Sequence, residues 1–317
     1  MKKQTYLLGL ILASGPLATA TFGATYFLPG VSMESGWHDA EKEWNDVDDN
    51  MCWAAQAACM AQYWQDWYVK AGNKLPTGTP TGYTTLEDGS LSSNIFETFK
   101  ANWTNLAGTG DLGLPWYFTG AAPTWYYNHG YSSNSAWSKL QSTTTHAGAF
   151  SELYPGGVSE FEKTEGLVEH LQYDGGLSIQ EFTDAMMHHI TEEYSIVGLS
   201  LDFWLKTGGH AGGHAVTLWG FETDDTTNLA NAIYITDSDD GYYGIKRYEI
   251  DTYYDGFDTE LGTYLDESLR DKYSTSFDKF ITLSVDRFVT AIPEPSAFGL
   301  LAGIFALAVS TARRRRK

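Results

Sequence analysis

The sequence predicts an α+β fold in which one long helix packs against an antiparallel sheet. Residues 51–70 contain no Gly or Pro, are rich in Ala and have apolar residues at helical spacing. Residues 196–285 contain short runs rich in β-branched and aromatic residues, and clusters of Gly, Asn and Asp separate these runs. Helices that come first and an antiparallel sheet that follows indicate an α+β domain with one core.

The N-terminus has the three regions of a secretory signal peptide. A start with two lysines precedes an apolar run over residues 6–17, and small residues follow at 18–20. We predict a signal peptide over residues 1–20 with cleavage after Ala20, and cleavage after Ala24 is the alternative. The protein is therefore expected to leave the cytoplasm.

The C-terminus has a different pattern. Pro-Glu-Pro at 293–295 precedes an apolar run of 16 residues at 297–312 and a basic cluster at 313–317. The run is at the short edge for a membrane span, and the basic cluster suits the cytoplasmic side. Residues 293–317 together resemble the PEP-CTERM sorting signal of exopolysaccharide-producing Gram-negative bacteria. The resemblance implies a transient membrane anchor that a sorting enzyme removes, followed by release or attachment to the cell surface; a simple tail anchor is the alternative.

The chain is strongly acidic. It carries 20 basic and 40 acidic residues, a net charge of −20. Between the predicted signal peptide and the predicted tail the counts are 13 and 39, which leaves −26. Such a surface repels a phosphate backbone, so nucleic acid is not an expected partner. Residues 25–290 show no internal repeat and no break in composition, so we expect one domain there.

The predicted helix brings a cysteine to its first turn. Asp49 or Asn50 is the expected N-cap, which places Cys52 where free backbone N–H groups and the helix dipole favour an anion. The pKa of the Cys52 thiol should therefore be lowered toward that of a reactive thiolate. Cys59 lies two turns further on, about 10 Å away in a regular helix, which is too far for a disulfide. We expect Cys59 to be a small buried apolar residue and both cysteines to be free thiols.

Three segments follow the predicted helix. Residues 74–90 are rich in Thr, Gly and Pro and are expected to form an exposed loop. Residues 93–102 predict a short helix. Residues 103–154 are dense in aromatic residues and glycine. Such a segment is either a set of loops held by its own rings or a platform for an extended peptide or a sugar.

Residues 178–193 predict a further helix. Ser178 and Glu181 have the spacing of a capping box, and apolar residues follow on one side. The adjacent His188 and His189 cannot face the same way in such a helix. We therefore interpret both as structural or solvated side chains.

The predicted strands bring a histidine and a carboxylate together. They cover residues 196–201, 215–222, 232–237, 243–250 and 280–285. His214 directly precedes the second strand, and Asp237 ends the third. Because two strands joined by a polar connection pair as a hairpin, the start of one and the end of the other lie at the same edge of the sheet. We therefore expect His214 and Asp237 to be neighbours.

A cysteine at a helix start, a histidine and a carboxylate are the components of a nucleophilic catalyst. In this interpretation the Cys52 thiolate attacks a carbonyl carbon. His214 stabilises the thiolate and later protonates the leaving amine, and Asp237 fixes the imidazole tautomer. The tetrahedral intermediate also needs oxyanion donors, for which we expect the backbone N–H of Cys52 and a cation just upstream.

The sequence leaves a metal-site alternative open. His210 and His214 are four residues apart with three aspartates nearby, and two histidines with a carboxylate can bind zinc or iron. The four glycines within 208–213 disfavour a helix, so the i,i+4 geometry is not expected. The acidic run 237–241 resembles a calcium loop only weakly, because Gly is at its fifth position and Tyr248 at the twelfth.

Five motifs occur in a fixed order along the chain. They are Lys42-Glu-Trp-Asn45, Asp48-Asp49, Cys52-x-Ala-Ala, Gly213-His-Ala-Val-Thr-Leu-Trp-Gly220 and Ala232-Ile-Tyr-Ile-Thr-Asp-Ser-Asp239. Together they closely resemble the IdeS/Mac immunoglobulin-degrading cysteine peptidases. Their order and spacing agree over roughly residues 35–285, with the aromatic middle only loosely similar. The resemblance implies a papain-like fold, hydrolysis of peptide bonds, and no metal or organic cofactor.

Carried over by position, the resemblance implies Cys52 as nucleophile, His214 as base and Asp237 as the residue that orients it. It also implies Asp239 as a supporting acid and Lys42, ten residues before the cysteine, as an oxyanion-hole donor. The chain departs from the family in an extra glycine and histidine run before His214 and in one added residue between His214 and Asp237. The surface loops that would recognise an antibody hinge are not matched.

We therefore predict a secreted cysteine endopeptidase that acts on a protein substrate, with immunoglobulin as one candidate. The alternative is a surface-retained binding or adhesion protein on a catalytically silent papain-like scaffold. The aromatic segment and the sorting tail support this alternative. A metal-dependent hydrolase is the third hypothesis. Contact with a membrane is expected only through residues 293–317.

Overall fold

A computed structural model describes most of the chain between the predicted signal peptide and the predicted tail. The described residues are 23–43, 47–87, 89–121, 148–164, 167–172, 177–205, 207–252, 259–261 and 273–289. The signal-peptide and sorting-tail predictions fall outside these ranges. Within them, every helix is too short or too polar to cross a membrane.

The strands of the described residues form one large antiparallel sheet and one small one. The large sheet contains β1 (Thr25–Phe27), β4 (Val168–Gln172), β5 (Ser195–Leu205), β6 (His210–Thr223), β7 (Ala230–Thr236), β8 (Lys246–Thr252), β9 (Thr259–Leu261) and β10 (Tyr273–Ser284). Its order is β1-β6-β5-β10-β9-β8-β7, and β4 also pairs with β10. A further pairing of β6 with β7 closes the sheet on itself. The small sheet pairs β2 (Tyr83–Thr85) with β3 (Leu91–Ser93).

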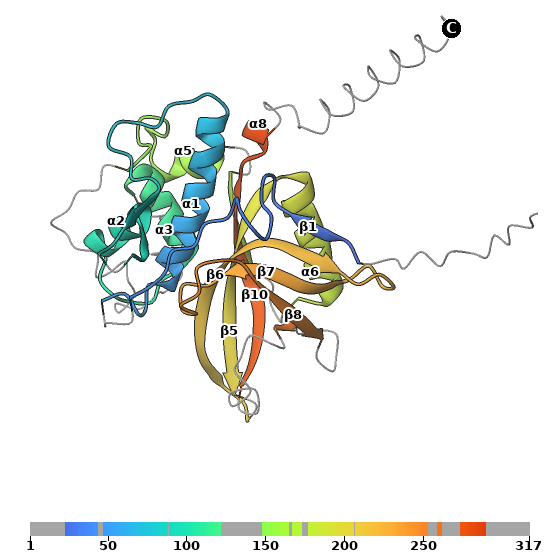
Figure 1. Ribbon diagram of the computed structural model, residues 1–317. Helices are drawn as coiled ribbons and strands as arrows, with labels where there is room; N and C mark the ends of the chain where they lie inside the picture. The colour runs from blue at the N-terminus through green and yellow to red at the C-terminus, as the bar shows by residue number, and fades with distance from the viewer. Residues whose placement is uncertain are drawn as a thin grey trace, which may run out of the picture.

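The helices lie in two places relative to the large sheet. They are α1 (Cys52–Lys70), α2 (Asn94–Asn102), α3 (Gly110–Thr119), α5 (Val158–Lys163), α6 (Ile179–Met186), the π-helix η2 (Met187–Glu192) and α8 (Asp286–Val289). In Figure 1, α1 stands between the sheet and a group formed by α2, α3 and α5, while α6 lies beside the sheet away from that group. The predicted α+β class, with a helix packed on an antiparallel sheet, is confirmed.

The long helix α1 is buried on nearly every side because it lies between two layers. It contacts β5, β6 and β10 on one side and α2 and α3 on the other. Trp53 and Trp64 are fully buried within these contacts. Alanines let the neighbours approach closely: a Cβ built on Gly113 of α3 would lie only 2.9 Å from the Ala57 Cβ. The Ala-rich composition is therefore a packing requirement as well as a helix signal.

Gln56 joins the first turns of α1 to the sheet through two hydrogen bonds. Its Nε2 donates to the carbonyl oxygens of Leu199 and Val216 at 2.9 and 2.8 Å, which joins the helix to both β5 and β6. The side chain is 3% exposed. The strand can approach because residue 198 is Gly, where a Cβ would lie 2.6 Å from the Gln56 amide carbon. Gln56 follows Cys52 by one helical turn, so these bonds fix the position of the cysteine over the sheet.

The start of α1 differs from the prediction that Asp49 or Asn50 caps it. The N-cap is Met51, and no side chain accepts a hydrogen bond from the first turn. The Asn50 N–H donates to Asn105 Oδ1 at 2.7 Å, so this residue joins the start of α1 to the loop before α3. The N–H groups of the first turn therefore lack a side-chain cap.

The hairpin of β5 and β6 is longer than predicted. The second strand begins at His210, before the predicted start at residue 215, because the glycine run takes part in the pairing. Leu205 N donates to Gly209 O at the turn. Gly208 and Gly209 have φ angles of 95° and 106°, which glycine adopts without strain. The glycines therefore form a tight turn and an extended strand rather than an irregular loop.

Helix α3 corrects the interpretation of the aromatic segment as loops. Trp116, Tyr117 and Phe118 lie in this helix and are at most 1% exposed, so they belong to the core and cannot act as a ligand platform. The helix ends at Gly120, whose φ of 81° is the left-handed conformation that glycine tolerates. The part of the aromatic segment at residues 122–147 lies outside the described residues.

The segment 74–102 and the capping box at Ser178 can also be compared with their predictions. The short helix at 93–102 is confirmed as α2, and part of the expected loop at 74–90 forms the strand β2. The capping box is confirmed, since Ser178 Oγ accepts from Glu181 N and the Glu181 carboxylate accepts from Ser178 N. The helix that follows does not stay regular, because it changes from α6 into the π-helix η2.

Replacing Gln56 tests how α1 is held to the sheet. We expect Gln56→Leu to lower the free energy of unfolding by about 2 kcal/mol, because two buried carbonyl oxygens lose their donor. Urea unfolding measures this difference. Gln180→Leu, on the exposed side of α6, is the matched control and should change the value by less than about 0.5 kcal/mol. Similar values for the two variants would show that the Gln56 bonds do not hold the helix.

Candidate active site

A cleft at the start of α1 collects the side chains that the sequence singled out. It has a volume of about 330 Å³ and lies between the loop before α1, residues 107–109, and the strands β5, β6 and β10. Its lining includes Lys42, Cys52, His214, Asp239 and Lys279. Cys52 is the first residue of α1 and is half-buried.

His214 and Asp237 meet as the hairpin prediction required. β6 and β7 pair antiparallel with Thr217 opposite Thr236, which brings His214 near the residue that follows β7. The distance from His214 Nε2 to Asp237 Oδ1 is 2.6 Å, and both side chains are buried. Since Nε2 is used in this bond, Nδ1 is the ring nitrogen left for the hydrogen bond between His214 and Cys52.

Lys42 and Asp239 form a second pair beside the first. Lys42 Nζ lies 2.5 Å from Asp239 Oδ1 and donates to the Asp49 carbonyl oxygen at 2.6 Å. Its side chain is 4% exposed. Asp239 Oδ2 lies 3.6 Å from His214 Nδ1. The backbone N–H of Asp239 donates to Asp237 Oδ1 at 2.9 Å, so one short turn after β7 holds both carboxylates in place.

The charges in the cleft favour a thiolate facing an imidazolium. Burial, the largest influence, disfavours the thiolate of Cys52, but the hydrogen bond to His214 and the charges of His214 and Lys42 together lower its pKa. Burial likewise disfavours the charged form of His214. The hydrogen bonds to Asp237 and Cys52 outweigh it and raise the pKa of His214 to about 10. The two shifts have opposite signs, and both favour transfer of the thiol proton to the imidazole.

The comparisons with known proteins address the second half of the chain. Residues 175–271 match the model of the Mac-1 family. This confirms the resemblance to the IdeS/Mac family over those residues. No curated protein matches the chain.

The Mac-1 match covers one part of the cleft and not the other. It includes His214, Asp237 and Asp239, whereas Cys52 and Lys42 precede it. The two parts are brought together by the docking of α1 on β5 and β6, through contacts such as those of Gln56. The mixed helix and antiparallel sheet fit the papain-like fold that the family resemblance implies.

The metal alternatives in this region find little support in the geometry. His210 and His214 lie on one strand, where four residues span about 13 Å along the backbone, so they do not have the i,i+4 geometry of a helical metal site. One ligand atom each of His214, Asp237 and Asp239 lie within 4.8 Å of one another. However, an ion there would have to displace the Lys42 ammonium from Asp239. The acidic run at residues 237–241 is also a poor calcium site, because Lys246 Nζ lies 2.8 Å from Asp240 Oδ2.

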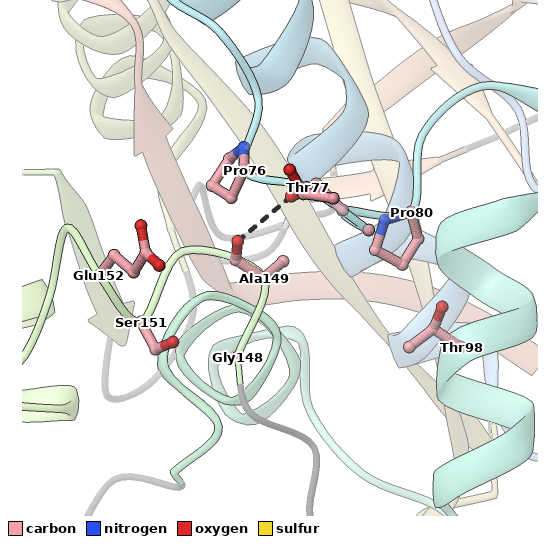
Figure 2. A pocket seen from close by; sticks show the side chains of 10 residues that line it. Pro76, Thr77, Pro80, Thr98, Gly148, Ala149, Ser151 and Glu152 are labelled. Atoms are coloured by element: carbon pink, nitrogen blue, oxygen red, sulfur yellow. Dashed lines mark hydrogen bonds between the residues drawn. The ribbon is translucent and has the colours of Figure 1, made fainter.

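A second cavity, of about 340 Å³, lies among the helices (Figure 2). It is lined by residues 76–80, Thr98, Gly148, Ala149, Ser151 and Glu152, and the Thr79 hydroxyl donates to the Ala149 carbonyl oxygen at 3.3 Å. Its described lining contains hydroxyl groups and the single carboxylate of Glu152, but no cysteine, histidine or lysine. It therefore offers no nucleophile and base pair, and the Cys52 cleft is the better candidate.

Two carboxyl groups shortly before Lys42, the buried Asp39 and the half-buried Glu41, were not predicted from the sequence. Asp39 is 1% exposed, and its Oδ2 accepts from Gly244 N at 2.8 Å. Burial, together with the nearby Glu41 carboxylate, raises the pKa of Asp39 to about 9. Burial and the neighbouring aspartates raise the pKa of Glu41 to about 7. The mixed sequence Asp-Ala-Glu-Lys at residues 39–42 is typical of an exposed segment, so it does not predict this burial.

The raised pKa of Asp39 makes stability depend on pH. Between about pH 4 and pH 9 the folded state keeps a proton on Asp39 that the unfolded state releases, so the free energy of unfolding falls as pH rises. Asp39→Asn removes this loss while its side-chain oxygen can still accept from Gly244. We expect the variant to gain on the wild type from pH 5 to pH 9 in urea unfolding. The exposed Asp225→Asn is the control, and equal pH slopes for wild type and Asp39→Asn would contradict the assignment.

Proposed function

We propose that the protein is a cysteine endopeptidase in which Cys52 is the nucleophile. The observation that supports this best is the chain of hydrogen bonds from Cys52 to His214 and from His214 to Asp237, at the edge of an open cleft. A nucleophile, a base in contact with it and a group that orients the base are the components of covalent acyl transfer. The family match is consistent with cysteine peptidase activity.

In the proposed mechanism the Cys52 thiolate attacks the carbonyl carbon of the scissile peptide bond. The tetrahedral intermediate collapses as His214 transfers its Nδ1 proton to the leaving amine, which produces a thioester on Cys52. Water then attacks the thioester and gives a proton to His214, and the thiolate is released. Asp237 holds Nε2 throughout, so that Nδ1 always faces the sulfur.

The oxyanion of the intermediate needs donors in the same cleft. The first-turn N–H groups of α1 have no side-chain cap, so the backbone N–H of Cys52 is one candidate. Lys42 is the second. An ammonium has three N–H donors, and the Asp239 carboxylate and the Asp49 carbonyl oxygen use two of them, which leaves one for the substrate. In this proposal Asp239 acts through Lys42, as a positioning residue.

The substrate that we propose is a protein, and the family resemblance makes immunoglobulin one candidate. No metal or organic cofactor takes part in the proposed mechanism. We further propose that residues 1–20 direct export, that residues 25–290 form the peptidase domain, and that residues 293–317 are a sorting tail. A sorting enzyme would remove the tail and leave the protein released or at the surface of a Gram-negative bacterium.

The activity can be tested with a proteome-derived peptide library and mass spectrometry. We expect the wild type to cleave a defined set of peptides, and Cys52→Ala and His214→Ala each to lower kcat/KM by at least about 10³-fold, because each removes a group that changes bonding in the reaction. Cys59→Ala, a buried cysteine in the same helix, is the matched control and should retain activity. Equal cleavage by wild type and Cys52→Ala would rule out the proposed nucleophile.

The same variants distinguish the peptidase from the binding-protein alternative. A protein that acts by adhesion alone would keep its full biological effect as Cys52→Ala, because the fold is unchanged. Loss of effect in Cys52→Ala together with loss of cleavage supports the peptidase.

A further inference from the structure

Outside the cleft, a second group of metal-binding side chains lies at the π-helix η2. Among the described residues only two groups of this kind occur, and the other is His214 with Asp237 and Asp239. We infer that His188, His189 and Glu193 form a binding site for a divalent transition-metal ion such as zinc, held on the sheet away from the catalytic cleft.

The distances between the ligand atoms suit such an ion. Glu193 Oε1 lies 3.1 Å from His188 Nε2, and Glu193 Oε2 lies 3.1 Å from His189 Nδ1. One ligand atom from each of the three residues can be chosen so that all lie within 4.8 Å of one another. A tetrahedral zinc ion with bonds of about 2.1 Å holds its ligand atoms about 3.3 Å apart. Only small side-chain adjustments would therefore enclose an ion.

The π-helix explains how two adjacent histidines reach one carboxylate. In an α-helix residue i+5 points well away from residue i, which is why the sequence alone indicates that His188 and His189 diverge. In η2 the backbone bonds run from i to i+5, and Glu193 N donates to His188 O at 3.0 Å. Glu193 thus lies over both histidines, as the fourth residue after one and the fifth after the other. Their ring centroids are 5.0 Å apart.

The surroundings hold both histidines in the orientation that a metal ligand needs. His188 Nδ1 lies 3.0 Å from Glu192 Oε2, so with an ion bound at Nε2 the Nδ1–H would donate to this carboxylate. A carboxylate on the second ring nitrogen is the usual support of a metal-bound histidine. The His189 side chain is 5% exposed and packs edge-on against Phe280, so its ring is fixed as well.

The charges also favour a cation. The carboxylates of Glu169, Glu192 and Glu193 all interact electrostatically with His188 or His189. Half of the His188 side chain is exposed, which gives an ion and a water ligand access from solvent.

The position of the site indicates a structural role. Phe280 packs on His189, whereas the preceding Lys279 lines the catalytic cleft. Because neighbouring residues of a strand point to opposite faces, the site and the cleft lie on opposite faces of β10. An ion at η2 would tie this helix together and strengthen its packing on β5 without entering the reaction.

Zinc binding should be measured by calorimetry on the untagged protein in the Cys52→Ala background, which removes the reactive thiol as a competing ligand. We expect one equivalent of Zn²⁺ to bind, and Co²⁺ to give the visible absorption of a four-coordinate ion. His188→Ala and Glu193→Gln should each weaken binding at least tenfold, because each removes a ligand. Saturating Zn²⁺ should raise the Tm of the parent and not that of His188→Ala.

His170→Ala is the matched control. His170 also pairs with a carboxylate, at 2.6 Å from Asp111, but it belongs to neither group of metal-binding side chains found among the described residues, so its loss should leave zinc affinity unchanged. Zinc affinity that is the same in parent and His188→Ala, or that falls only in His170→Ala, would overturn the assignment. The readout does not depend on peptidase activity, so its failure and the failure of the proposed function are distinguishable.

Discussion

The docking of the first turns of α1 on β5 and β6 decides where the reactive sulfur lies. Cys52 is on a helix and His214 is on a strand, so no local interaction fixes the distance between them. The Gln56 amide bridges that gap by donating to carbonyl oxygens of both strands. Gly198 and Gly113 allow the close approach that these bonds need. A buried amide one turn from the cysteine thus sets the geometry of the cleft.

The electrostatics of the cleft follow from this arrangement. Two buried cations, Lys42 and protonated His214, face two carboxylates at the end of β7, so the thiolate enters a nearly balanced set of charges. Asp39 and Glu41, which interact with Asp237, would add negative charge if they were ionised. Their raised pKa values keep Asp39 protonated near neutral pH and Glu41 partly so. Burial therefore limits the negative charge around Asp237.

Sequence reasoning predicted the main parts of the site because their signals are local. The Ala-rich helix, the change to strand periodicity and the hairpin between His214 and Asp237 follow from residue patterns, and β6 pairs with β7 as that hairpin required. Lys42 and Asp239 came only from resemblance to a family, because neither position has a local signal. Gln56, Asp39 and the π-helix were missed, since long-range packing determines all three. The N-cap was predicted wrongly because α1 begins later than expected, with Met51 and not Asp49 or Asn50 at the N-cap position.

The central claim is that Cys52 is a thiolate stabilised by His214, and rate-resolved labelling with iodoacetamide tests it most directly. Labelling from pH 4 to pH 9, with each site identified by peptide mass, compares Cys52 with Cys59 in one molecule. The account predicts rapid alkylation of Cys52 well below the ordinary cysteine pKa of about 8.5, and loss of this behaviour in His214→Ala. Cys59 should stay slow, because burial raises the pKa of its thiol. Slow labelling of both cysteines across the range would contradict the claim.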